Sequence, residues 1–193
     1  MPRRSWRSIL SAPPVAARQH RLLRTLPDAC PYDEEVPDQK PPRLVGGEQE
    51  TLLALLQYQR DSLVRKVADV DQEAARRPIV QSGTSLLWLI KHVTYAETVW
   101  IVDRFAGEDV VAMDDAVRPT DTLTSAVDAY RATWARVDSI VSATSTLDEP
   151  CRGLGDGPPV NLRWVLMHLL EETARHAGHA DIIRELIDGS TGR

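Results

Sequence analysis

Long apolar runs and common catalytic motifs are both missing from this sequence of 193 residues. No stretch approaches the 18 or more apolar residues that a membrane-spanning helix needs, so we expect a soluble protein without a membrane partner. The HExxH, GxSxG, P-loop and GxGxxG patterns are absent, which leaves zinc-protease, serine-hydrolase and nucleotide-binding functions without support. Strand-like alternation and internal repeats are absent too, and the sequence therefore favours a helical domain.

Cysteine is scarce, since Cys30 and Cys151 are the only two, and both lie in segments rich in proline or glycine. Two thiols in a chain of this size do not indicate a disulfide scaffold. They are typical of a reducing compartment, so we expect the protein in the cytoplasm. Structural zinc sites usually have four protein ligands rich in thiolate, and neither cysteine lies within a predicted helix.

Acidic residues are absent from residues 1–27, which hold six arginines. The remainder of the chain carries 17 basic against 28 acidic side chains, a net charge of −11, which disfavours binding to nucleic acid or anionic lipid. Residues 28–47 add several prolines and a Gly-Gly pair. We therefore predict a basic, proline-rich and poorly ordered arm over residues 1–47, followed by one domain over residues 48–189.

Four segments of this domain repeat apolar residues at helical spacing. Asn161 is placed to cap the last of them, and Gly107 is placed to end the second. The connections over residues 107–119 and 146–160 are too long for tight turns, so we predict an all-α four-helix bundle with long crossover connections. The expected helices run from Glu48 to about Val70, from about Thr84 to Ala106, from about Asp121 to Ser142, and from Asn161 to Gly189.

The fourth predicted helix carries polar residues on its apolar face. Glu172 and His176 lie one turn apart on the stripe formed by Leu162, Leu169 and Ile183. A polar group buried without a partner costs roughly 2 to 7 kcal/mol, so this pair requires a partner if the face is buried. A divalent metal ion is such a partner.

A third candidate ligand, His92, lies on the apolar stripe of the second predicted helix. His92 lies roughly 15 Å from one end of its helix and roughly 21 Å from the other, and Glu172 and His176 lie roughly 16 and 22 Å from the start of theirs. These depths match for antiparallel helices and nearly match for parallel ones. Two His and one carboxylate suit catalytic zinc or the facial triad of non-haem iron. Glu97 and Asp181 are our candidates for the groups that orient the imidazole rings.

Simpler interpretations of the same residues stay open. Glu172 and His176 are equally compatible with an exposed pair spaced i,i+4, which contributes a few tenths of a kcal/mol. A buried acid paired with an imidazole, without a metal, is a further alternative. His168 and His179 fit ordinary residues at the edge of a bundle helix, with rings half out of the core.

The sequence resembles the DinB-like four-helix bundles, particularly their actinobacterial mini-circle protein branch. The resemblance covers roughly residues 48–189 and is carried by ETLLALLQYQRDSLVRKV, SGTSLLWLIKHVTYAETVW and NLRWVLMHLLEETARHAGHADIIRELIDG. Similar members carry a metal triad of one His on the second helix and two residues one turn apart on the fourth, which match His92, Glu172 and His176. Many relatives have His at the position of Glu172, and the Glu found here resembles the mycothiol-dependent isomerase type.

What the resemblance implies is a metal-dependent thiol S-transferase or isomerase that uses a low-molecular-weight thiol of the mycothiol type on a small electrophile. It implies a divalent metal, zinc by preference, as cofactor, and the thiol as cosubstrate. The alternatives are a metal-stabilised binding or stress-response protein without turnover, and a metal-free binding protein with Trp88 and Tyr95 as pocket wall. The sequence leaves a homodimer open and indicates no surface for it.

Overall fold

The computed structural model describes residues 39–111, 113–153 and 157–191 of the chain. These residues form helices and connections, and within them strand-like pairing is limited to an isolated bridge between Pro150 and Asn161. None of the helices in this described part combines the length and hydropathy needed to cross a membrane. The predicted arm lies mostly outside the described residues, and its poor order stays a prediction.

The four long helices predicted from the sequence are confirmed, and one short helix was missed. The elements are α1 Glu48–Val67, α2 Gln72–Arg76, α3 Leu86–Glu97, the π-helix η1 Thr98–Phe105, α4 Leu123–Ser142 and α5 Leu162–Asp188. Helix α2 forms because the Asp71 side chain accepts hydrogen bonds from two backbone N–H groups of its first turn. Helix α3 begins later than expected, since Ser85 rather than Thr84 caps it.

The second predicted helix does not stay α-helical to its end. After Glu97 it continues as η1, in which the Ala106 N–H donates to the Ile101 carbonyl five residues back, at 2.9 Å. The chain then turns at Gly107, whose φ of 67° lies in the left-handed region, as expected of a helix stop. The π-helix places Trp100 and Arg104 on the side of the bundle that faces the start of α5.

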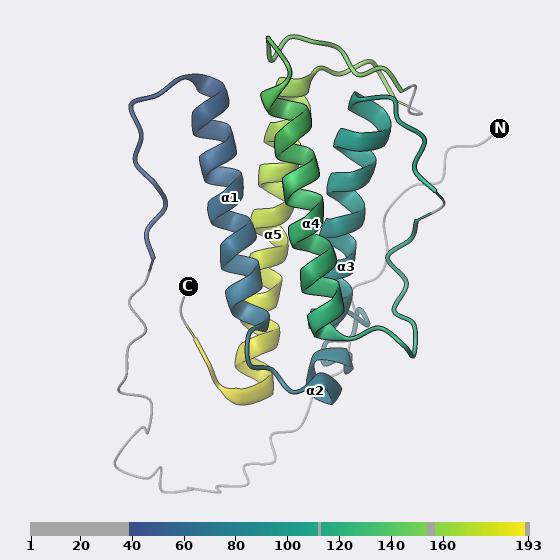
Figure 1. The fold of residues 1–193 in the computed structure, drawn as a ribbon. Helices are drawn as coiled ribbons and strands as arrows, with labels where there is room; N and C mark the ends of the chain where they lie inside the picture. The colour runs from purple at the N-terminus through teal and green to yellow at the C-terminus, as the bar shows by residue number, and fades with distance from the viewer. Residues whose placement is uncertain (1–38, 112, 154–156, 192–193) are drawn as a thin grey trace, which may run out of the picture. The chain divides into compact units, whose positions relative to one another are not determined.

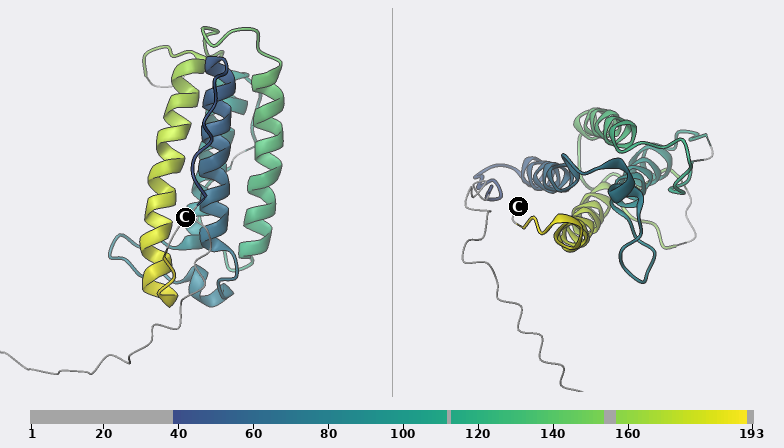
Figure 2. Two further views of the ribbon diagram at one scale, coloured as in Figure 1. Left: turned by 90° about the vertical axis from the view of Figure 1, so that its left-hand side faces the viewer. Right: turned by 90° about the horizontal axis from the view of Figure 1, so that it is seen from below.

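The four long helices pack side by side, with α1 against α5 and α3 against both α4 and α5 (Figures 1 and 2). Helices α1 and α5 are parallel, because Arg163 pairs with Glu48 at their starts and Arg184 donates to the Lys66 carbonyl near their ends. Helix α3 runs the opposite way. Residues 106–111 and 113–122 then return along the bundle, so that α4 begins at the same end as α3 (Figure 1). The predicted crossover is confirmed for this connection.

Two apolar clusters fill the interior of the bundle. One gathers around Leu63, Leu87, Ile90 and Ala180, and the other around Leu56, Val137, Leu162 and Leu169. Two basic side chains of α1 are buried with these clusters, since Arg60 is only 1% exposed and Lys66 is also buried. Arg60 follows Leu56 by four residues, which places it on the apolar stripe itself.

Candidate metal centre

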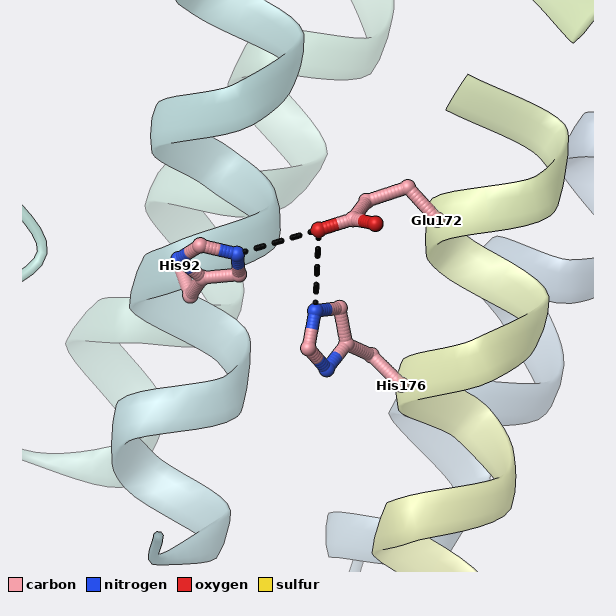
Figure 3. A group of neighbouring side chains, drawn as sticks. All are labelled: His92, Glu172 and His176. Carbon is pink, nitrogen blue, oxygen red and sulfur yellow. Dashed lines mark hydrogen bonds and ion pairs between the residues drawn. The ribbon is translucent and has the colours of Figure 1, made fainter. Parts of the chain in front are cut away.

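Helices α3 and α5 bring the three predicted ligands together. His92 projects from α3, and Glu172 and His176 project from successive turns of α5 (Figure 3). Oε1 of Glu172 lies 3.2 Å from Nε2 of His92 and 3.1 Å from Nε2 of His176. One atom from each residue lies within 4.8 Å of the other two. The antiparallel arrangement of α3 and α5 therefore brings the matching depths on the two helices into register.

The burial of the three side chains decides between an exposed pair and an inward-facing site. The side chain of His176 is 9% exposed, that of Glu172 15% and that of His92 23%. An exposed pair on the surface of α5 does not fit this burial. The site is enclosed by two helices but keeps one side toward solvent, which a small molecule needs in order to enter.

Two neighbouring groups hold the ring of His92. Its Nδ1 lies 2.7 Å from Oδ2 of Asp115, and its face stacks on Trp88 with ring centroids 4.6 Å apart. A carboxylate at Nδ1 fixes the orientation of an imidazole whose Nε2 binds a metal. Asp115 lies in the connection before α4, 23 positions from His92. It was missed because a loop residue at that separation has no helical register to place it.

The predicted orienting groups, Glu97 and Asp181, have other partners. Oε2 of Glu97 lies 2.6 Å from Nη2 of Arg60, and both side chains are 1% exposed. Asp181 pairs with Lys66 on α1. Both expectations are therefore wrong, because Glu97 points to the opposite side of α3 from His92 and Asp181 faces the neighbouring helix α1.

The electrostatic environment favours the ligand forms of two of the three groups. Burial raises the pKa of Glu172, but its contacts with the His92 and His176 rings outweigh burial and leave the pKa below its ordinary value. Burial lowers the pKa of His176, and the nearby Glu172 carboxylate opposes that shift only in part. At neutral pH the acid is therefore an anion and His176 a neutral imidazole, the forms that bind metals.

Hydrogen bonding within the site favours a cation between the three groups. If Nδ1 of His92 donates its proton to Asp115, Nε2 of the neutral ring carries a lone pair. That lone pair then faces Oε1 of Glu172, which is itself an acceptor, at 3.2 Å. A metal ion between them removes this conflict. The two distances to Oε1 of Glu172, 3.2 and 3.1 Å, also suit it, since two ligands of tetrahedral zinc with bonds of about 2.1 Å lie about 3.4 Å apart. The donor set fits zinc or ferrous iron.

The remaining two His residues of α5 lie next to the triad without joining it. Nδ1 of His179 lies 3.3 Å from Nδ1 of His176, on the far side of the ring from Glu172. His168 instead stacks on Trp164, with ring centroids 5.1 Å apart. Neither belongs to the group of three converging donors, as predicted.

Comparisons with known proteins show the family to which the chain belongs. The sequence profile of the family described as mycothiol-S-transferase matches residues 51–189, which include all three triad residues. The chain belongs to the mycothiol-S-transferase family. The predicted membership of the DinB-like bundles is thereby confirmed, while the mini-circle branch stays a prediction.

A solved structure resembles the fold of this mycothiol-S-transferase family member. Among solved structures, a conserved protein from Enterococcus faecalis has a TM-score of 0.57 and 16% sequence identity, over 75% of this chain and 99% of that chain. At that identity the likeness concerns the fold alone. A search of curated proteins found no match.

Proposed function

We propose that this chain is a metal-dependent thiol S-transferase that joins a low-molecular-weight thiol of the mycothiol type to a small electrophile. The observation that carries the proposal is the convergence of His92, Glu172 and His176 on one point, in a chain that belongs to the mycothiol-S-transferase family. Its few cysteines suit a reducing compartment, and we place the activity in the cytoplasm.

The residues of the site have separate tasks in this reaction. His92 and His176 each offer Nε2, and Glu172 offers one carboxylate oxygen, to hold the metal. When bound, the metal supplies the positive charge that lowers the pKa of a thiol and makes the thiolate available at neutral pH. Asp115 keeps Nε2 of His92 directed into the site, and Trp88 limits rotation of the same ring.

The bond changes follow from the thiol as nucleophile. For an electrophile with a leaving group, a C–S bond forms while the bond from that carbon to the leaving group breaks, and the leaving group departs with the electron pair. The thiol proton passes to solvent through the open side of the site. The contribution of the enzyme is to hold thiol and carbon together in a fixed orientation.

The protein's described thiol does not supply the sulfur. Cys151 lies before α5 and outside the converging triad. Burial raises the pKa of its thiol, and nearby Arg104 offsets that shift only in part. A thiol of raised pKa is a weak nucleophile at neutral pH. The sulfur therefore comes from a cosubstrate in this mechanism.

The test is thioether formation from mycothiol and 1-chloro-2,4-dinitrobenzene at pH 7.5, followed by absorbance with zinc-loaded protein. We expect turnover in the wild type and in Cys151→Ser, and its loss in His176→Ala and after chelation. Turnover that survives chelation contradicts the metal's role. Zinc-loaded protein that is inert with this pair and with a wider panel of thiols and electrophiles favours a metal-stabilised binding protein instead.

A further inference from the structure

A cavity lies about two helical turns from the triad, where η1 ends and α5 begins. Its volume is about 200 Å³ and its lining is mostly apolar. We call it the tryptophan cavity. Its walls include Trp100, Arg104, Cys151, Pro159, Val160 and Trp164. None of the triad residues lines it, so the proposed thiol chemistry does not account for it.

The wall of the cavity opposite the helices is fixed by backbone hydrogen bonds. The Gly153 N–H donates to the Arg104 carbonyl at 2.7 Å, and the Cys151 N–H donates to the Val160 carbonyl at 2.9 Å. A Cβ on Gly153 would lie 3.0 Å from Cα of Arg104, so a larger residue there would press on the backbone of η1 and shift it. Arg152 and Gly153 are therefore attached to the end of η1, and Val160 is held against Cys151, so these described parts of the cavity wall are fixed without a ligand.

The chemistry of the lining indicates the kind of ligand. The rings of Trp100 and Trp164 lie 5.2 Å apart at 52°, and they offer flat apolar surface. The guanidinium carbon of Arg104 lies 4.2 Å from the centroid of Trp100. Within the described residues, no carboxylate forms an ion pair with Arg104. Two indole rings beside one cation suit a planar apolar group that carries an anionic substituent.

An aromatic wall leads from this cavity toward the triad. His168 stacks on Trp164 at 21° and meets Trp100 edge-on at 4.9 Å. Along α5, Trp164, His168 and Glu172 succeed one another by one turn each, so Trp164 lies about 12 Å from Glu172 along the axis. One extended substrate of this length therefore fills the cavity with one end and reaches the metal centre with the other.

We infer that the tryptophan cavity is a subsite for the electrophile, and that the electrophile is an extended molecule with a planar apolar ring and an anionic group. The ring packs inside the cavity against the indole rings of Trp100 and Trp164, the anion faces Arg104, and the reactive carbon extends along His168 to the metal centre. A cavity of about 150 Å³ holds benzene, so this one accommodates one or two rings. An apolar lining suits the ring better than a polar thiol. The assignment to the electrophile rests on the proposed function, but binding in the cavity does not.

Binding is therefore measured directly, by calorimetric titration of 1-naphthoate onto the full chain, with and without a chelator. We expect one site per chain and the same affinity in both conditions, because the triad does not line the cavity. Trp164→Ala and Arg104→Gln each weaken binding by about tenfold, which corresponds to about 1.4 kcal/mol. Arg131→Gln, on the exposed surface of α4, leaves it unchanged. Circular dichroism confirms that each variant is folded.

Four results would overturn the inference. The first two are the absence of naphthoate binding and the same affinity for naphthoate in all three variants. The third is that uncharged 1-naphthalenemethanol binds as tightly as naphthoate. The fourth is that Trp164→Ala loses mycothiol binding rather than naphthoate binding. The two proposals also fail separately. Naphthoate binding without thioether formation contradicts the proposed function and leaves the cavity as a binding site. If the protein forms the thioether with mycothiol equally well in the wild type and in Trp164→Ala, and naphthoate does not bind, the subsite is contradicted and the proposed function stands.

Discussion

Helix α3 carries two polar residues, five positions apart, that belong to two different sites: a buried ion cluster and the triad. Glu97 lies in a buried ion cluster with Arg60 and Tyr130, whereas His92 belongs to the triad. In the ion cluster, Nε and Nη2 of Arg60 donate to Glu97 at 3.0 and 2.6 Å. The Tyr130 hydroxyl donates to the same carboxylate at 3.2 Å.

The difference between these sites lies in how donors match acceptors. In the ion cluster the cation and the anion neutralise each other, and the carboxylate of Glu97 meets three donors. In the triad, two imidazole nitrogens converge on Oε1 of Glu172, and the exposed guanidinium of Arg175 pairs only with the other oxygen, Oε2, so no described cation lies among the three converging atoms. Burial of charge is therefore not what marks the functional site of this bundle. What distinguishes the triad is a set of acceptors that requires a further cation. The predictions below test this difference between the ion cluster and the triad.

The largest expected effect is on the stability of the ion cluster. Glu97→Leu leaves Arg60 with Asp138, whose side chain is 47% exposed, as its remaining ion-pair partner. A buried charge without its partner destabilises a fold by about 3 to 5 kcal/mol. We expect a loss of that size in urea unfolding of the chelator-treated protein.

Glu172→Leu is the matched control in the triad. Its carboxylate is partly exposed and holds no buried cation, so without metal we expect a loss of about 1 kcal/mol or less. Similar losses in the two variants would show that both clusters are structural, and the comparison would fail.

The next effect concerns metal content. His92→Ala and His176→Ala each remove one of three ligands, so we expect purified protein to lose most of its bound zinc. His168→Ala, one turn from Glu172 and outside the triad, should keep one zinc per chain. Elemental analysis of matched preparations measures this. Zinc that follows His168 or His179 instead would show that the triad is wrongly assigned.

A smaller effect is expected when a group behind a ligand is changed. Asp115→Asn keeps the shape of the side chain but removes the charge that faces Nδ1 of His92. Loss of such an orienting carboxylate typically costs about 10- to 100-fold in metal affinity. Competition with a zinc indicator measures the change. Asp114→Asn is the control, because Asp114 pairs with Arg118; equal affinities in the two variants would remove Asp115 from the site.

The smallest effect is the pH dependence of stability from His168. Burial lowers its pKa below the ordinary value of about 6.5, so below that pH the unfolded chain binds a proton more readily than the folded chain. Stability from this residue is therefore present above about pH 6.5 and falls as the pH drops toward the lower pKa of the folded state. His168→Phe keeps an aromatic ring and should reduce this slope in urea unfolding between pH 7.5 and 5.5. An unchanged slope would contradict the burial of the imidazole.

Helical periodicity and capping predicted most of the fold from sequence. Asn161 caps α5 and Gly189 ends it with a φ of 79°, as their residue types indicate. The π-helical end of the second helix was not predictable in the same way, because apolar spacing over two turns hardly separates π from α geometry. Helix α2 was missed because Pro78 and its neighbours indicate a connection more strongly than five residues indicate a helix.

The triad could be predicted from sequence because its members lie on long helices whose register relates depth to residue number. His92 and Glu172 are 80 positions apart, yet helix geometry alone matched their levels. Asp115 has no such register, since it lies in a connection. Arg60 was not predictable for another reason. Its charge favours an exposed position although its spacing places it on the apolar stripe of α1, where the buried Glu97 from α3 neutralises it.

The parallel pairing of α1 and α5 bears on how the proposed metal would enter the triad. Because α1 holds α5 at both ends, through Arg163 and Arg184, the helix that bears Glu172 and His176 is held in place without an ion between it and α3. Under the proposed function, loading and release would take place on a folded chain, without refolding of the bundle. The active fraction would then follow the concentration of free metal around the protein, rather than being fixed once when the chain is made.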